Sequence, residues 1–177
     1  MIGLQEYLPS KRDSWIWNLA EFKDVADCVD LAQRHFQIEI DQIFVPQPDL
    51  YAKNISQAIC NQQYRLNTEQ ILVARHRDSH ALMAYSWVSR GDSVKYALEE
   101  MAVVNFAHVD LTLTARTRIT LLAQMLHQWY LWCSICRIPV LVSSSIRSDQ
   151  TAFMRLHERA GFSVRGSVAY IKIKDDK

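Results

Sequence analysis

Three closely spaced β-rich runs between residues 70 and 104 are the feature that most constrains how this chain folds. They cover residues 70–77, 81–89 and 95–104 and are rich in apolar and β-branched residues, which favour strands. Two short segments separate them, Asp78-Ser79-His80 and Arg90-Gly91-Asp92-Ser93, and both consist of residues typical of turns. Because such short connections join antiparallel neighbours, the sequence predicts an antiparallel meander of three strands.

Apolar residues at three- and four-residue steps predict helices on both sides of this meander. The expected elements before it are a strand over residues 15–22 and helices over 25–36 and 50–64. After it we expect a helix over 115–136 with Thr114 as its N-cap, a buried strand over 138–146, a helix over 150–160 capped by Asp149 and ended by a left-handed Gly161, and strand material over 163–174. The order β-α-α-β-β-β-α-β-α-β predicts one α/β domain over residues 1–177.

Composition limits the classes of function. The chain has 177 residues, 49% apolar and 22% charged, which suits one domain with its own core. A formal net charge of +1 argues against a general basic surface for nucleic acid or anionic membranes. The first residues lack the pattern of a signal peptide, and no apolar run reaches about 18 residues, so a cytoplasmic protein without a membrane span is expected. Cys133 and Cys136 form a C-x-x-C pair, but no second pair at zinc-site spacing accompanies them, which favours reduced thiols over a metal site.

The end of the last expected helix carries a more specific pattern. Residues 156–162 read Leu-His-Glu-Arg-Ala-Gly-Phe. This stretch resembles the L-Y/H-E-x-x-G-F ending of the GNAT acetyltransferase superfamily, particularly members such as the phosphinothricin acetyltransferases that have His in the Tyr position. The resemblance implies an α+β fold with a mixed, mostly antiparallel central sheet flanked by helices. It also implies that the strands over 95–104 and 138–146 splay apart and hold acetyl-CoA between them, with the backbone around Met101 and Val103 pairing with the pantetheine arm.

In that family the pyrophosphate lies on backbone amides at the start of the following helix, in a loop of the form R/Q-x-x-G-x-G/A. The corresponding residues here, 111–120, contain no glycine, and none occurs between Gly91 and Gly161. In one interpretation Arg116 and Arg118, with the Thr114 and Thr117 hydroxyls, replace some of the amide contacts. In the other, this is an ordinary helix start with solvated arginines. Gln150 stands where the family usually has an Asn that contacts the cofactor arm.

Acetyl transfer to an amine needs a base and an acid for the leaving thiolate. Glu99 and Glu100 are the candidate bases; side chains alternate along a strand, so only one of them faces the cleft. The alternative interpretation is that both are structural carboxylates beside Lys95. His157 occupies the acid position, with a capping or packing role as the alternative.

Two functions are consistent with these residues. One is an acetyl-CoA-dependent N-acetyltransferase that acts on a small amine or a protein amine. The other is a GNAT fold kept without catalysis as a structural or protein-binding component, such as a bacteriophage virion-associated protein, in an oligomer or larger assembly. A nucleic-acid module is a distant third, because carboxylates balance the basic residues.

Overall fold

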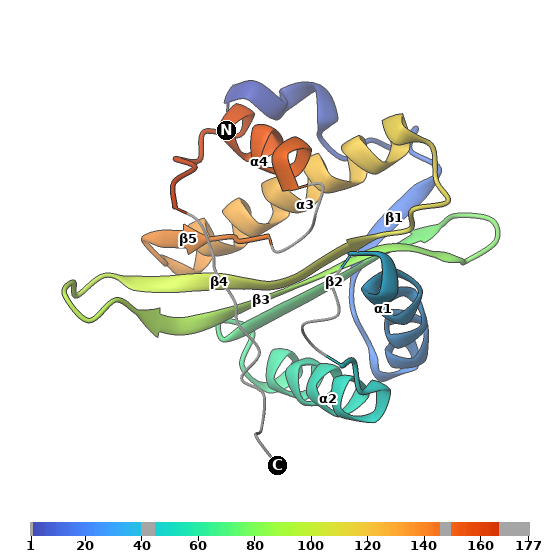
Figure 1. Cartoon of the computed structure of the whole chain (residues 1–177), viewed down its shortest axis with the longest axis horizontal. Coiled ribbons are helices and arrows are strands. Elements are labelled where there is room, and N and C mark those ends of the chain that lie inside the picture. Colours follow the sequence, from blue (N-terminus) through green and yellow to red (C-terminus); the bar gives the residue numbers. More distant parts are fainter. Residues whose placement is uncertain (1, 40–44, 146–149, 167–177) are drawn as a thin grey trace, which may run out of the picture.

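A twisted sheet lies between two layers of helices in the computed structural model, which describes residues 2–39, 45–145 and 150–166 (Figure 1). The strands follow one another in chain order across the sheet: β1 (Trp15–Leu19), β2 (Glu69–His76), β3 (Leu82–Ser93), β4 (Glu100–Val109) and β5 (Val140–Val142). The first four pair antiparallel, and β5 pairs parallel with β4. The expected mixed, mostly antiparallel sheet is therefore confirmed.

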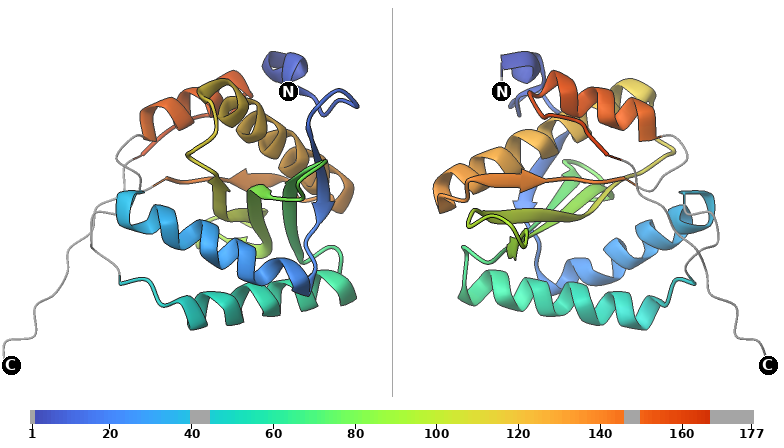
Figure 2. Two further views of the ribbon diagram at one scale, coloured as in Figure 1. Left: turned by 90° about the vertical axis from the view of Figure 1, so that its right-hand side faces the viewer. Right: turned by 60° about the vertical axis from the view of Figure 1, so that its left-hand side comes forward.

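The helices divide between the two faces of the sheet (Figure 2). One face carries α1 (Val25–Glu39) and α2 (Pro48–Tyr64), and the other carries α3 (Ala115–Cys136) and α4 (Gln150–Arg159). Two short 3-10 helices, η1 (Ile2–Tyr7) and η2 (Phe22–Asp24), precede α1. Each face has its own buried apolar cluster, because each layer of helices turns an apolar side toward the sheet.

The centre of the α3 layer is a polar contact surrounded by apolar side chains. Gln124 of α3 is fully buried, and its Oε1 accepts hydrogen bonds from the indole N–H groups of Trp15 at 2.8 Å and Trp17 at 2.7 Å. Its Nε2 donates to Asp13 Oδ2 at 2.9 Å. This one amide therefore joins α3 to β1 and to the segment before it.

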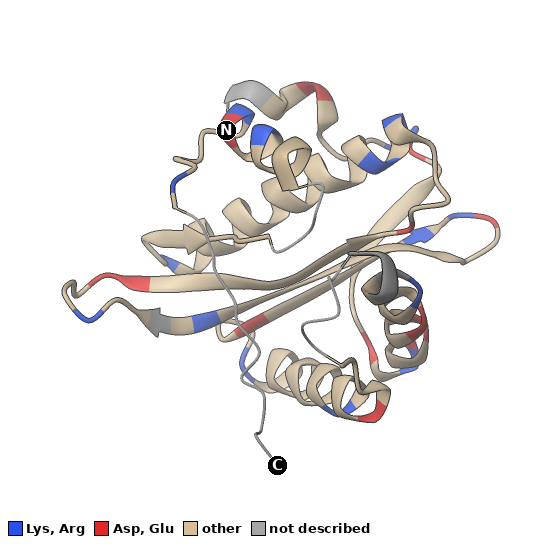
Figure 3. Cartoon of the chain, viewed as in Figure 1, with Lys and Arg blue, Asp and Glu red and all other residues tan. Residues whose placement is uncertain are grey.

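An ion pair fixes the start of the other layer. Asp24 of η2 is buried, and its Oδ1 accepts from Arg75 Nη2 of β2 at 2.6 Å, while the same nitrogen donates to Asp27 Oδ2 at 2.6 Å. Farther along, the Tyr51 and Tyr85 hydroxyls hydrogen-bond to each other between α2 and β3. Positive and negative residues are interspersed over both layers (Figure 3), as the small net charge suggests.

The meander is confirmed, but its second turn was misplaced. Residues 90–93 belong to β3, and the turn lies at residues 95–96, so β4 begins at Glu100 rather than at residue 95. Gly91 has φ +108° and lies where the register between β3 and β4 shifts, so it accommodates a β-bulge inside the strand. The glycine that resembled a turn signal is a bulge residue.

The helix boundaries agree better with the sequence. α3 spans the predicted residues, and Thr114 caps it as expected, while Gly161 has φ +94° after α4. The strand predicted over 15–22 ends at Leu19, and only Val140–Val142 of the segment 138–146 pairs with β4. Residues 163–166 are not strand; the predicted Asp149 cap and the remainder of the last strand lie outside the described residues.

The four cysteines are free thiols in this structure. Burial raises the pKa of Cys28 to about 12 and that of Cys133 to about 11, whereas Cys60 and Cys136 are half-buried. Among the described residues no group of His, Cys, Asp and Glu side chains has the arrangement of a metal site. None of the described helices is both long and apolar enough to cross a membrane.

Candidate functional site

The parallel strands β4 and β5 part soon after they begin to pair. Their register contains three pairs, Met101 with Val140, Ala102 with Leu141 and Val103 with Val142. β5 ends at Val142, whereas β4 continues to Val109. The second half of β4 therefore has no strand partner on its β5 side within the described part of the chain, which is the separation that the family resemblance predicts.

A β-bulge lies in this open half of β4. Val88 of β3 pairs with Val104 and Trp87 pairs with Phe106, so Asn105 is an extra residue on β4. Its exposed side chain donates from Nδ2 to Ser89 Oγ at 2.9 Å. Bulges turn the following side chains and are common beside active sites.

The start of α3 lies beyond the end of β4. Asp110 shapes the connection, because its Oδ1 accepts from both the backbone N–H and the hydroxyl of Thr112. Thr114 then caps the helix by accepting from the N–H of Thr117 at 3.2 Å. The N–H groups of Ala115 and Arg116 have no intramolecular acceptor among the described residues. Two free amides at the positive end of a helix of 22 residues form a suitable position for an anion.

The predicted cofactor residues at this helix start differ in whether their side chains already have hydrogen-bond partners in the protein. Arg116 is exposed, and Arg118 is half-buried with a buried Nε that has no hydrogen-bond partner in the described structure. The Thr117 hydroxyl hydrogen-bonds to the Thr114 hydroxyl at 2.9 Å, so both are already engaged in the cap. The two arginines, rather than the threonines, are available to a bound anion.

The predicted bases lie at the other end of β4. Glu99 is exposed in the segment before the strand, and Glu100 forms a bidentate ion pair with Arg90, at 2.7 Å from Nε and 2.8 Å from Nη2. The hydrogen bond from Arg90 lowers the pKa of Glu100 below its ordinary value. β4 has 10 residues, so its two ends are about 30 Å apart at the usual rise per residue. The structure does not bring these carboxylates together with the start of α3. Met101 and Val103 lie in the segment that pairs with β5.

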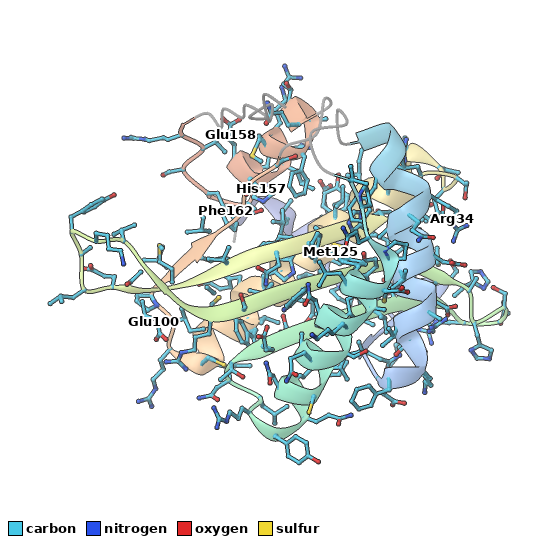
Figure 4. All side chains as sticks on the ribbon, turned by 60° about the horizontal axis from the view of Figure 1, so that its bottom comes forward. Arg34, Glu100, Met125, His157, Glu158 and Phe162 are labelled. Atoms are coloured by element: carbon cyan, nitrogen blue, oxygen red, sulfur yellow. The ribbon has the colours of Figure 1, made fainter. Side chains whose placement is uncertain are left out.

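His157 is a buried residue of α4 that lies beside Phe162 (Figure 4), with their ring centroids 4.9 Å apart. Its ring centroid is 4.4 Å from that of Phe153. Its Nδ1 is 2.9 Å from the Phe153 carbonyl oxygen, and because a carbonyl only accepts, Nδ1 carries the proton. Nε2 is buried and has no hydrogen-bond partner among the described residues. Burial lowers the pKa of His157. Gln150, the other predicted residue on α4, is exposed at its first position.

This burial predicts a pH dependence of stability. The unfolded chain takes up a proton at His157 near pH 6.5, whereas the folded chain does so only at lower pH. The contribution of neutral His157 to the unfolding free energy is therefore fully present above pH 6.5 and falls as the pH decreases below it. We expect His157→Leu to reduce the slope of unfolding free energy against pH between pH 7 and 5, by up to about 1.4 kcal/mol per pH unit. The measurement is urea unfolding at a series of pH values. His127→Gln is the comparison: burial lowers the pKa of that histidine too, but it is less buried, so we expect a smaller reduction of the slope. An unchanged slope in His157→Leu contradicts the prediction.

An aromatic cluster that no sequence pattern predicted lies on the α1 and α2 side of β4. Its members are Phe36, Tyr51, Tyr85, Phe106 and His108. His108 is buried and stacks on Phe106 with 5.9 Å between ring centroids. The bulge at Asn105 places these two side chains on that face. A bulge depends on cross-strand register, so the sequence has no local signal for it.

Solved structures with this arrangement of elements are numerous. An aminoglycoside 6'-N-acetyltransferase from Acinetobacter baumannii matches with a TM-score of 0.64 at 16% identity, over 91% of this chain and 99% of that one. Glucosamine-6-phosphate N-acetyltransferase from Arabidopsis thaliana matches with a TM-score of 0.61 at 13% identity, over 92% and 100% of the two chains. A ribosomal-protein-alanine N-acetyltransferase from Brucella melitensis matches with a TM-score of 0.60 at 14% identity, over 90% and 99%.

The chain has the GNAT fold. No protein-family profile and no curated protein sequence matches it. The parting of β4 from β5 and the free amides of α3 thus occur in a chain with a GNAT-like fold that is at most 16% identical to the three N-acetyltransferases named above.

Proposed function

We propose that this protein binds acetyl-CoA in the opening between β4 and β5 and transfers the acetyl group to an amine. The proposal rests on one observation: the half of β4 without a partner on its β5 side leads to the free N–H groups of Ala115 and Arg116. An extended pantetheine arm needs an unpaired strand edge, and a pyrophosphate needs amide donors at one end of it. The N-acetyltransferase names of several fold neighbours support the same function.

The proposed role of each residue follows from the chemistry of its side chain or backbone. The Ala115 and Arg116 amides and the Arg116 and Arg118 guanidiniums bind the pyrophosphate, which compensates for the missing glycines. The amine nitrogen attacks the thioester carbonyl and the new C–N bond forms. The C–S bond then breaks, the nitrogen gives up one proton, and the departing thiolate takes one up. The catalytic roles of Glu99, Glu100 and His157, and the cofactor contacts of Met101, Val103, Thr117 and Gln150, stay predictions.

Isothermal titration with CoA and acetyl-CoA tests the binding step, and release of free CoA thiol in the presence of an amine panel tests the transfer step. We expect saturable binding of both nucleotides and thiol release that depends on the amine. No heat and no thermal shift at millimolar acetyl-CoA would rule the proposal out.

The alternative is a GNAT fold that acts as a structural or protein-binding component, including one associated with a phage virion. The Arg90 ion pair of Glu100 and the apolar surroundings of His157 favour this alternative, because both residues have partners that serve structure. It predicts acetyl-CoA binding without thiol release for any amine, or no binding at all, together with a stable oligomer or a copurifying partner. A monomer that turns over acetyl-CoA contradicts it.

A further inference from the structure

A pocket of about 490 Å³ lies far from the start of α3. Its walls come from the end of β1, the segment after α2, the beginning of β2 and the last turns of α3. The lining residues that matter here are Leu19, Leu66, Gln70, Arg90, Trp132 and Ile135, with Arg137 at the end of α3. α3 has 22 residues, so this pocket and the proposed pyrophosphate site are about 30 Å apart along the helix.

The buried part of this pocket contains an amide that its surroundings do not satisfy. Gln70 is 9% exposed, and its Oε1 has no hydrogen-bond partner among the described residues. The neighbouring Gln62 is different, because its Oε1 accepts from the N–H of Ile71 at 2.6 Å and its Nε2 donates to the Ala20 carbonyl at 3.3 Å. A buried acceptor without a donor is unfavourable, so Gln70 points to a ligand that donates an N–H or O–H at this position.

The outer part of the pocket is apolar. Leu66 is 64% exposed and Ile135 is 79% exposed, whereas Trp132 beneath them is 7% exposed. The Trp132 indole N–H donates to the Leu66 carbonyl at 3.1 Å, which holds the two walls together. A branched or aromatic ligand group would cover this surface, and the burial of apolar area would stabilise the complex.

Charged groups of both signs line the pocket. Glu69 already accepts from the Trp87 indole at 2.6 Å, and Arg90 is paired with Glu100. Arg137 is exposed and has no described partner for its guanidinium. Arg137 therefore favours an anionic group on the ligand.

We propose that this pocket binds a small apolar carboxylic acid that also carries a hydrogen-bond donor, as an apolar amino acid does. Its N–H donates to Gln70 Oε1, its apolar side chain packs on Leu66, Trp132 and Ile135, and its carboxylate faces Arg137. The proposal does not depend on acetyl-CoA binding, because the two sites share no residue.

Leucine is the probe, with 4-methylpentanoate lacking the amine and 3-methylbutylamine lacking the carboxylate. We expect leucine to raise the melting temperature at millimolar concentration and to bind about tenfold more tightly than either analogue, since each analogue loses one polar contact. Equal binding of all three compounds, or binding of none, overturns the proposal.

Variants locate the site independently of acetyl-CoA. We expect Gln70→Leu to leave the free protein as stable as before and to lose the preference for leucine over 4-methylpentanoate. Arg137→Gln weakens leucine binding about threefold, whereas the neighbouring exposed Arg65→Gln leaves it unchanged. Both pocket variants keep the wild-type response to acetyl-CoA, whatever that response is. Leucine binding that neither variant alters places the ligand elsewhere and overturns the assignment.

Discussion

Replacing Gln124 with Leu is expected to lower the free energy of unfolding by about 2–5 kcal/mol. Leucine fills nearly the same space but accepts no hydrogen bond, so the indole N–H groups of Trp15 and Trp17 lose their common acceptor. Asp13 loses the donor to its Oδ2 as well. Urea unfolding followed by tryptophan fluorescence measures the change.

Gln128→Leu is the matched control, because Gln128 lies one turn along α3 and is only half-buried. We expect it to change stability by no more than about 0.5 kcal/mol. Adding Trp15→Phe and Trp17→Phe to the Gln124→Leu chain removes the unsatisfied donors and recovers part of the loss. Equal destabilisation by the two Gln→Leu changes would show that the shared acceptor does not hold α3 to β1.

The second large effect concerns the proposed cofactor site. Ala115→Pro is expected to weaken CoA binding about 10- to 100-fold, because it removes one of the two free amides that would face the pyrophosphate. Ala115 is the first residue of α3, a position that tolerates proline. Thr114 before it has φ −59° and ψ 150°, a conformation that proline also accepts in its predecessor. The fold should therefore remain intact.

Ala115→Gly controls for this change, since it keeps the N–H and shortens the side chain. We expect its CoA affinity to be close to that of the wild type, and the melting temperatures of both variants to be similar. Titration calorimetry with CoA compares the three proteins. If Ala115→Pro binds CoA as tightly as the wild type does, the pyrophosphate does not lie on the start of α3.

Features that depend on neighbouring residues could be predicted from the sequence. The bounds of α3, its Thr114 cap and the left-handed Gly161 all follow from helical periodicity and local backbone chemistry. The order of β2, β3 and β4 followed too, because short connections leave antiparallel neighbours little choice. The position of the α3 start, where the anion site is proposed, was predictable as well, since a helix start is a local feature.

Features that depend on contacts between distant segments required the tertiary structure. Gly91 and Asn105 are bulge residues only because of the register between β3 and β4. Glu100 faces Arg90 across that same pair of strands, and His157 is enclosed because α4 packs on α3. A side chain's exposure, its pKa and its partners are set by whatever folds against it, and residues far along the chain decide that.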